Sequence, residues 1–373
     1  MTQDVNIHRI DQPWAMGNLV LKNRIVRSAT VEGLSTDNGA PTQQLIDIAV
    51  ALAKGGVGLI VAGAAYVNRE GKGDKHTTGM DHDRLIEPLS RLCTAVHAAG
   101  GTLAAQLAHC GSTLNPAMLP EKEALFGPSK MIDPVNGHPV LELNANQIFT
   151  IVDDYSKAAS RVRKAGFHAV QIHAAHGYLI NQFLSPSRNR RSDRYGGSIN
   201  GRARFLYQIY EAIRGAVGSD FPVFIKMSSY DGFSGGVEPD EAAQIASVLD
   251  SMGIDAIEVS AGTPEGAKKG GWDHIRPAPF EEGSLLKYAL QIKANVRCPV
   301  ISVEGWRDPL AIIKALVKID AVSMSRPFIR EPDLVNRWLD GDLSPAQCIS
   351  CNQCLDLIMD SGLGCIFHNR DRT

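Results

Sequence analysis

Two imidazoles and a phenol lie close together in the stretch HAAHGY, at positions 173–178. His173 and His176 are three residues apart, and Tyr178 follows two residues later. Two ring N–H groups can stabilise the negative charge that develops on a carbonyl oxygen. A phenol with an ordinary pKa near ~10 is protonated at neutral pH and can donate a proton. The set is therefore a candidate site for proton transfer beside a carbonyl group.

Four of the seven cysteines lie near the end of the chain, in CISCNQCLDLIMDSGLGC. Cys348, Cys351, Cys354 and Cys365 have the spacing C-x2-C-x2-C-x10-C. In a reducing compartment such a group indicates metal or redox chemistry rather than a disulfide framework. The spacing is typical of an iron–sulfur cluster or, less often, of zinc. The alternative is a set of reduced, partly buried thiols that holds no metal.

The elements that must position these groups form a repeating pattern of strand and helix. Segments with helical spacing alternate with the strands, and a glycine often ends the helix, as in RKAGF and DSMGID. Such alternation predicts a parallel sheet, and eight strands favour a closed (β/α)8 TIM barrel of the α/β class over an open doubly wound sheet. No G-x-G-x-x-G follows the first strand, which weakens the dinucleotide-binding alternative. The apolar, β-branched runs predicted as strands are 25–30, 57–63, 102–109, 169–174, 223–228, 256–261, 300–305 and 321–326.

A barrel places its chemistry at the carboxyl ends of its strands, so the residues there form one candidate site. Both histidines of HAAHGY lie just past the fourth strand, which argues against ordinary core packing. A metal site would need a third ligand, and Glu304 is the only Asp or Glu at the other strand ends. The strand ends carry Thr30, Ala64, Gln106, His109, His173, His176, Lys226, Ser260, Gly305 and Arg326.

The segment INQFLSPSRNRRSDRYGGSINGRARF, at 180–205, resembles a long signature of the old yellow enzyme family. The resemblance starts at LKNRIVRSAT, continues through KGGVGLI and QLAHCG, and reaches the eighth strand. It therefore covers essentially the whole barrel. It implies an FMN-binding (β/α)8 barrel, in agreement with the strand count, and an ene-reductase that uses NAD(P)H to reduce an activated alkene.

The resemblance also implies roles for individual residues. His173 and His176 would hold the substrate carbonyl, and Tyr178 would donate a proton to the α-carbon. Lys226 stands where the family usually has arginine, near flavin N1 and O2, and either cation would stabilise reduced flavin. The other implied FMN-binding positions are Ala29, Thr30, Ala64 and Gln106 along the isoalloxazine, and Gly305, Ser325 and Arg326 at the phosphate.

Three further positions depart from the family pattern. Val31 stands where many members have a redox-tuning Thr or Cys, and it has no hydrogen to donate to flavin O4. Gly201 replaces the usual asparagine after YGGS, which we interpret as a structural difference. Ser112 replaces the arginine of the segment that contains His109, and we interpret His109 as structural.

The cysteine segment resembles that of the dienoyl-CoA reductase and trimethylamine dehydrogenase branch, which implies a 4Fe-4S cluster. In that branch flavin- and nucleotide-binding domains follow the barrel, whereas this sequence ends at Thr373. We therefore expect an FMN-binding barrel in residues 1–340 and a Cys-rich extension in 341–373. A redox partner protein or an inorganic donor would have to supply electrons to any cluster.

Composition excludes several classes of protein. The net charge is −2 and no basic stripe is present, so a nucleic-acid partner is not expected. No apolar run approaches the ~20 residues that cross a bilayer, and the N-terminus lacks the apolar core of a signal peptide. We expect a cytoplasmic homo-oligomer with no membrane partner.

Two functions remain open. The first is reduction of a small activated alkene by NAD(P)H through FMN. The second is an electron-transfer subunit, or a dienoyl-CoA reductase-like enzyme, whose flavin and cluster act with a partner. A third and weaker hypothesis is a Schiff-base aldolase that uses Lys226. The loops 110–140 and 262–282 are expected to decide the substrate.

Overall fold

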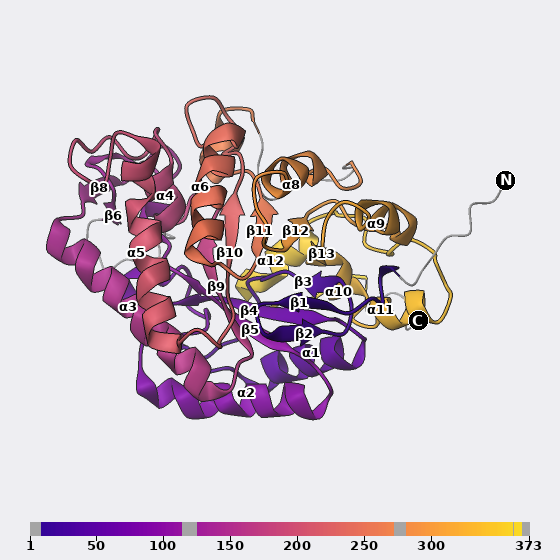
Figure 1. The fold of residues 1–373 in the computed structure, drawn as a ribbon. Helices are drawn as coiled ribbons and strands as arrows, with labels where there is room; N and C mark the ends of the chain where they lie inside the picture. The colour runs from indigo at the N-terminus through magenta and orange to yellow at the C-terminus, as the bar shows by residue number, and fades with distance from the viewer. Residues whose placement is uncertain (1–8, 114–124, 272–280, 361, 368–373) are drawn as a thin grey trace.

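The computed structural model describes residues 9–113, 125–271, 281–360 and 362–367. Eight parallel strands close into a barrel in the order β10-β11-β12-β13-β3-β4-β5-β9, which confirms the predicted fold (Figure 1). The barrel strands are β3 (Ile25–Arg27), β4 (Leu59–Tyr66), β5 (Leu103–Ala108), β9 (Ala169–Ala174), β10 (Val223–Ser228), β11 (Ile257–Ser260), β12 (Val300–Val303) and β13 (Ala321–Met324).

The barrel strands are buried on both faces, which is why their sequences are continuous apolar runs rather than alternating ones. Every residue of β5, β9 and β10 is buried. The barrel closes where the last strand, β13, pairs with the first, β3, and within it β9 pairs with both β5 and β10. This register places Gln106 beside Gln171, and the β10–β11 register places Lys226 beside Glu258. These four polar side chains therefore lie at neighbouring positions of adjacent strands.

Helices form the outer layer, as Figure 1 shows. The two glycine stops are confirmed: Gly166, with φ of 95°, caps the helix that ends in RKAGF, and Gly253, with φ of 90°, caps the one that ends in DSMGID. The main helices are α1 (Gln43–Lys54), α2 (Ile86–Ala98), α3 (Ala145–Ala165), α5 (Ile199–Val217), α6 (Pro239–Met252), α8 (Leu286–Lys293), α9 (Pro309–Ala315) and α11 (Leu334–Leu339).

Smaller elements complete the two ends of the barrel. A hairpin of β1 (Trp14–Met16) and β2 (Leu19–Leu21) packs Trp14, Met16 and Leu21 against apolar residues of the barrel interior. A three-stranded sheet follows β5 and consists of β6 (Leu125–Gly127), β7 (Met131–Ile132) and β8 (Pro139–Glu142). Short helices lie in the loops: η2 (Arg69–Gly71), η3 (Asp83–Leu85), η4 (Gly111–Thr113), α4 (Leu179–Leu184), α7 (Pro264–Lys268) and α10 (Arg326–Arg330).

The C-terminal segment packs against the loop that follows β3. The helix α12 (Gln353–Asp360), yellow in Figure 1, carries Ile358, which packs in one cluster with Leu34 and Leu363. The N–H of Leu363 donates to the carbonyl of Glu32 at 2.8 Å. The predicted division of the chain near residue 340 stays a prediction. Within the described residues, no helix combines the length and the apolar character needed to cross a membrane.

Candidate active site

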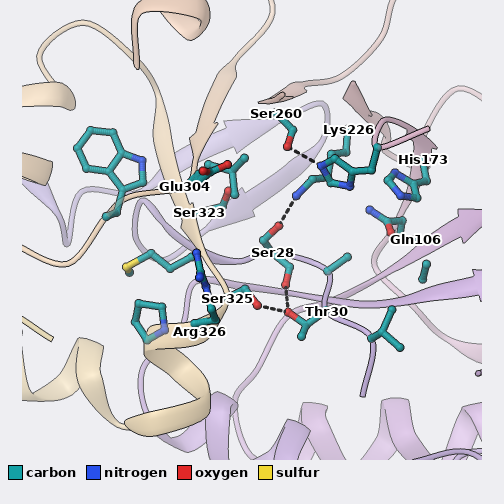
Figure 2. Close-up of a pocket in the computed structure, with 18 of the residues that line it drawn as sticks. Ser28, Thr30, Gln106, His173, Lys226, Ser260, Glu304, Ser323, Ser325 and Arg326 are labelled. Carbon is teal, nitrogen blue, oxygen red and sulfur yellow. Dashed lines mark hydrogen bonds between the residues drawn. The ribbon is translucent and has the colours of Figure 1, made fainter. Parts of the chain in front are cut away.

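One cavity at the carboxyl ends of the strands brings the predicted site residues together (Figure 2). The volume of this cavity is about 240 Å³. Ser260, Glu304 and Trp306 also line it, with Leu355 and Ile358 of α12. The predicted residues that line it are Ala29, Thr30, Ala64, Gln106, His173, His176, Tyr178, Lys226, Gly305, Ser325 and Arg326.

The two imidazoles and the phenol form a contiguous group at one side of this cavity. The ring of His173 lies edge-on to His176 at 5.3 Å and to Tyr178 at 4.7 Å between centroids. The backbone of His176 has a φ of 62°, and its N–H donates to Ser228 Oγ at 3.2 Å. Its Nε2 lies 2.7 Å from Ser260 Oγ. The expectation that both histidines lie past the strand is wrong for His173, which β9 itself directs into the cavity, whereas the turn after β9 directs His176 there.

Tyr178 lies beside a buried thiol that the sequence reasoning left out of the site. Cys110 and burial together raise the pKa of Tyr178. Burial also raises the pKa of Cys110 to about 12. Both groups are therefore protonated at neutral pH. A second cavity, of about 230 Å³ by the same measure, contacts both residues and continues toward Asp74 and Thr77.

Two polar side chains face the cavity from inside the barrel. Gln106 and Lys226 are 2% and 5% exposed, so both are held by the barrel interior. The Lys226 ammonium donates to Ser28 Oγ at 2.7 Å, as Figure 2 shows, and lies 3.2 Å from Glu258 Oε1. The sequence reasoning missed Glu258, because a single acidic residue inside an apolar strand gives no sign of which strand neighbours face it.

The opposite end of the cavity is formed by the segments after β12 and β13. Gly305 has a φ of 78°, and a Cβ there would lie 2.5 Å from the carbonyl oxygen of Glu281, so glycine is required. The hydroxyls of Thr30 and Ser325 are 2.6 Å apart, and Figure 2 shows both beside Arg326. Arg326 also donates to the side chain of Asn352 in the C-terminal segment.

The chemistry of the cavity matches FMN along its length. An isoalloxazine ring offers an imide edge that needs an amide partner and a cation, which Gln106 and Lys226 would supply. Its flat face needs apolar contacts, which Ala29, Val303 and Met324 would give. A phosphate needs a cation and hydroxyls, which Arg326 and the serine before it would supply in the strand-eight region where barrels often bind phosphate.

The four C-terminal cysteines line a separate small cavity, together with Arg326 and Asn352. Among the residues that the structure describes, none that lines it is a carboxylate or a histidine. Burial raises the pKa of Cys348 and Cys354, although Arg326 acts in the opposite direction. Among the described residues, no group of three or more Cys, His, Asp or Glu is arranged to hold a single metal ion.

The positions that depart from the family pattern are also placed. Val31 lines the cavity. His109 is buried, its Nδ1 accepts the N–H of Gly111 at 3.0 Å, and it is not among the lining residues of the cavity. A Cβ on Gly201 would lie 2.1 Å from the carbonyl oxygen of Gly196. Of the loops expected to decide the substrate, 114–124 and 272–280 lie outside the described residues.

Comparison with known sequences gives a family match and several relatives. The family model for the NADH:flavin oxidoreductase / NADH oxidase family matches residues 9–342. The NADH oxidase of Thermoanaerobacter brockii is 35% identical over 341 residues, which cover 90% of this chain and 52% of that protein. The 4,4'-dithiodibutanoate disulfide reductase of Rhodococcus erythropolis is 33% identical, over 96% of this chain and 94% of that protein. The chain thus spans about half the length of the first relative and nearly all of the second.

Solved structures give the same fold. A 2-naphthoyl-CoA reductase in complex with 2-naphthoyl-CoA matches with a TM-score of 0.91 and 28% identity, over 98% of this chain and 57% of that chain. The old yellow enzyme homologue from Zymomonas mobilis matches with a TM-score of 0.76 and 28% identity, over 90% of this chain and 94% of that chain.

Proposed function

The chain belongs to the NADH:flavin oxidoreductase / NADH oxidase family, which includes the old yellow enzymes, and from this premise we propose that it reduces the C=C bond of α,β-unsaturated carbonyl compounds with FMN and NAD(P)H. The observation that carries the proposal is the grouping of His173, His176 and Tyr178 in the same cavity as Gln106 and Lys226. Carbonyl binding, proton donation and flavin binding can then occur side by side.

Each residue has a defined task in this proposal. FMN, when bound, supplies two-electron transfer from the nicotinamide to the alkene. His173 and His176 bind the carbonyl oxygen and stabilise the charge that develops there. Tyr178 donates a proton to the α-carbon. Lys226 lies where it can balance the charge of reduced flavin, and Arg326 binds the phosphate.

The environment of Lys226 argues against the aldolase hypothesis. A Schiff-base lysine must lose its proton to attack a carbonyl. The Lys226 nitrogen is instead held in the barrel interior by Ser28 Oγ at 2.7 Å and by Glu258 at 3.2 Å. Lys226 therefore suits a fixed positive charge better than a nucleophile.

Purification and a reductase assay test the proposed function directly. The purified protein should be yellow, should release FMN on heat denaturation, and should catalyse NAD(P)H-dependent reduction of a simple enone such as cyclohexenone. Release of FAD, or no flavin after incubation with FMN, would overturn the cofactor assignment. An FMN-loaded protein that reduces a disulfide but no enone would overturn the alkene as acceptor.

The cysteine cavity supports a second candidate function, an electron-transfer unit or a dienoyl-CoA reductase-like enzyme that contains a 4Fe-4S cluster and acts with a partner. Four thiols with no carboxylate or imidazole among them form the soft ligand set that iron–sulfur clusters and zinc prefer. A cluster spreads its thiolates farther apart than a single ion does. Arg326 and Arg330 also line the cavity and would offset the negative charge of a cluster.

Metal analysis of anaerobically purified protein tests this candidate. About four iron and four acid-labile sulfides per chain would support the cluster, and zinc without sulfide would support a structural metal. Cys351→Ser, at an exposed position, should reduce the iron content if this thiol is a ligand. A chain that holds neither metal, with four titratable thiols, would overturn the second candidate.

A further inference from the structure

A fully buried carboxylate lies in the barrel interior beneath the cavity. Glu258 is 0% exposed and does not line the cavity itself. Its Oε1 accepts from Ser28 Oγ at 2.6 Å and Ser323 Oγ at 2.7 Å. The same oxygen lies 3.2 Å from the Lys226 ammonium, and Oε2 accepts from Gln171 Nε2 at 2.7 Å. Four donors, three on strands β9, β10 and β13 and one just after β3, therefore converge on one side chain.

These donors keep Glu258 ionised. Burial alone would raise the pKa of Glu258, but Lys226 and the hydroxyl and amide donors outweigh burial and leave the pKa below its ordinary value. An ionised carboxylate only accepts hydrogen bonds. Every group that faces Glu258 must therefore present a hydrogen to it.

This requirement sets the orientation of two side-chain amides, first that of Gln171 and through it that of Gln106. The carboxylate forces Gln171 to direct its NH₂ toward Glu258, so the carbonyl oxygen of Gln171 points away from it. That oxygen accepts from Gln106 Nε2 at 2.7 Å. The amide of Gln106 is thereby fixed with its own oxygen as the free acceptor, which is the partner that the imide N–H of an isoalloxazine needs.

Glu258 also offsets the positive charge of Lys226, the cation that would lie beside bound flavin. Lys226 and Glu258 are adjacent in the β10–β11 register and both lie in the barrel interior. A charge acts strongly at short range in such a low-dielectric region, and a neighbouring opposite charge cancels most of its effect. Lys226 paired with Glu258 stabilises negative charge on the flavin less than an unpaired lysine would.

We propose that Glu258 is a positioning residue that orients Gln106 through Gln171 and, by pairing with Lys226, lowers the reduction potential of the bound flavin. This inference rests on the proposed binding of FMN. It extends that proposal, because it assigns control of the potential to a residue that does not contact the cofactor. A low potential favours passing electrons onward to an acceptor over retaining them on the flavin.

A series of variants that remove one charge at a time from the FMN-loaded full chain tests the inference. In Glu258→Gln, Lys226 keeps an uncompensated charge, and the midpoint potential should rise. In Lys226→Gln, Glu258 remains as an unpaired negative charge, and the potential should fall. The double variant should lie between the two. We expect at least a tenfold change in the ratio of affinities for reduced and oxidised FMN in each single variant, which is about 30 mV for a two-electron couple.

A matched control separates this effect from the general loss of a buried ion pair. Asp133 is buried and pairs with Arg188 at 3.0 Å, and neither residue lines the cavity. Asp133→Asn should therefore leave the potential unchanged. Gln171→Leu breaks the link to Gln106 but keeps both charges, so it should weaken FMN binding with little change of potential.

The outcomes are distinct. FMN-loaded Glu258→Gln with a wild-type potential would overturn this inference and leave the proposed function intact. If Glu258→Gln does not fold, Lys226→Gln provides the test. An unchanged or raised midpoint potential in that variant would contradict the proposed effect of the Lys226–Glu258 pair. A wild-type chain that takes up no FMN would overturn the proposed function and this inference together.

Discussion

At the residue scale, the two imidazoles can be tested apart from the flavin. Removing one donor to a developing oxyanion costs roughly 10²–10³-fold in rate at well-organised sites. His173→Ala or His176→Ala should therefore slow enone reduction by that order, while NAD(P)H reduces the FMN nearly as before. Stopped-flow measurement of the two half-reactions checks this. Wild-type rates of enone reduction in both variants would make the pair structural, and a metal ion retained by the histidines would favour a metal site.

Tyr178 is tested by removing its hydroxyl. Cys110 and burial raise the pKa of Tyr178, so the phenol stays protonated throughout the neutral range and can act as the acid. Tyr178→Phe should slow alkene reduction roughly 10²–10⁴-fold, the usual contribution of a general acid, and should leave flavin reduction nearly intact. Cys110→Ala is the companion variant, because it removes the neighbouring thiol and keeps the phenol. Equal slowing of both half-reactions in Tyr178→Phe would exclude the proton-donor role.

We expect His109 to lower the free energy of unfolding as the pH becomes acidic. Burial lowers the pKa of His109 from 6.5 to about 4, so the folded protein resists a proton that the unfolded chain accepts. This stability is complete above pH 6.5 and is lost as the pH falls from 6.5 toward 4, by about 3 kcal/mol at most. His109→Asn keeps an acceptor for Gly111 but cannot titrate, so its free energy of unfolding should fall less over this range.

Comparing His109→Asn with the wild type separates the effect of His109 on stability from that of Glu32. Burial raises the pKa of Glu32 to about 7, so its contribution to stability is lost as the pH rises from 4.5 to 7, in the opposite direction. Chemical denaturation at several pH values between 4 and 7 measures the difference. Parallel pH profiles for wild type and His109→Asn would show that His109 is protonated in the folded protein as readily as in the unfolded one.

At the element scale, the barrel could be predicted because the residues that define each strand and helix are neighbours in the sequence. Each strand is a short buried run, and several main helices end at a glycine such as Gly166, so order and type follow from neighbouring residues. The residues at the strand ends then gather by closure of the sheet, which is why positions as distant as Thr30 and Ser325 meet at 2.6 Å.

Contacts that depend on register or on the tail could not be predicted this way. Glu258 is one acidic residue in an apolar run, and its partners come from other strands that only the closed register brings together. Leu355 and Ile358 lie in the C-terminal segment, whose cysteines predict metal binding. Their role as a wall of the cavity depends on how the tail folds back over the strand ends.

The wall formed by α12 gives a prediction about cofactor retention. Leu355 and Ile358 are partly buried and line the cavity, so truncating them exposes apolar surface of the cavity to water. Leu355→Ala combined with Ile358→Ala should raise the Kd for FMN about tenfold, or ~1.4 kcal/mol. Val317→Ala, on an exposed residue away from the cavity, is the control. Quenching of FMN fluorescence by the apoprotein measures Kd, and equal affinities would remove α12 from the binding site.

At the scale of the whole molecule, the cavity and the cysteine segment share one side chain. Arg326 lines both the flavin cavity and the cysteine cavity, and it contacts Asn352 between two of the cysteines in the sequence. The two proposed functions differ in the route by which electrons would reach the flavin. In the first a nicotinamide would enter the cavity directly, and in the second a partner protein would deliver electrons at the cysteines.

These two routes predict different behaviour of the isolated chain. If the protein acts as an alkene reductase by itself, NADH or NADPH should bleach the FMN absorbance of the purified chain within seconds, and an enone should restore it. If electrons must come through a partner, dithionite should reduce the FMN but neither nicotinamide should. Replacing Cys348 and Cys354 together by serine sharpens the test, because direct transfer from a nicotinamide does not use the thiols. FMN reduction by NAD(P)H that survives in this variant supports the first route. A wild-type chain whose bound FMN is reduced by dithionite but by neither nicotinamide supports the second.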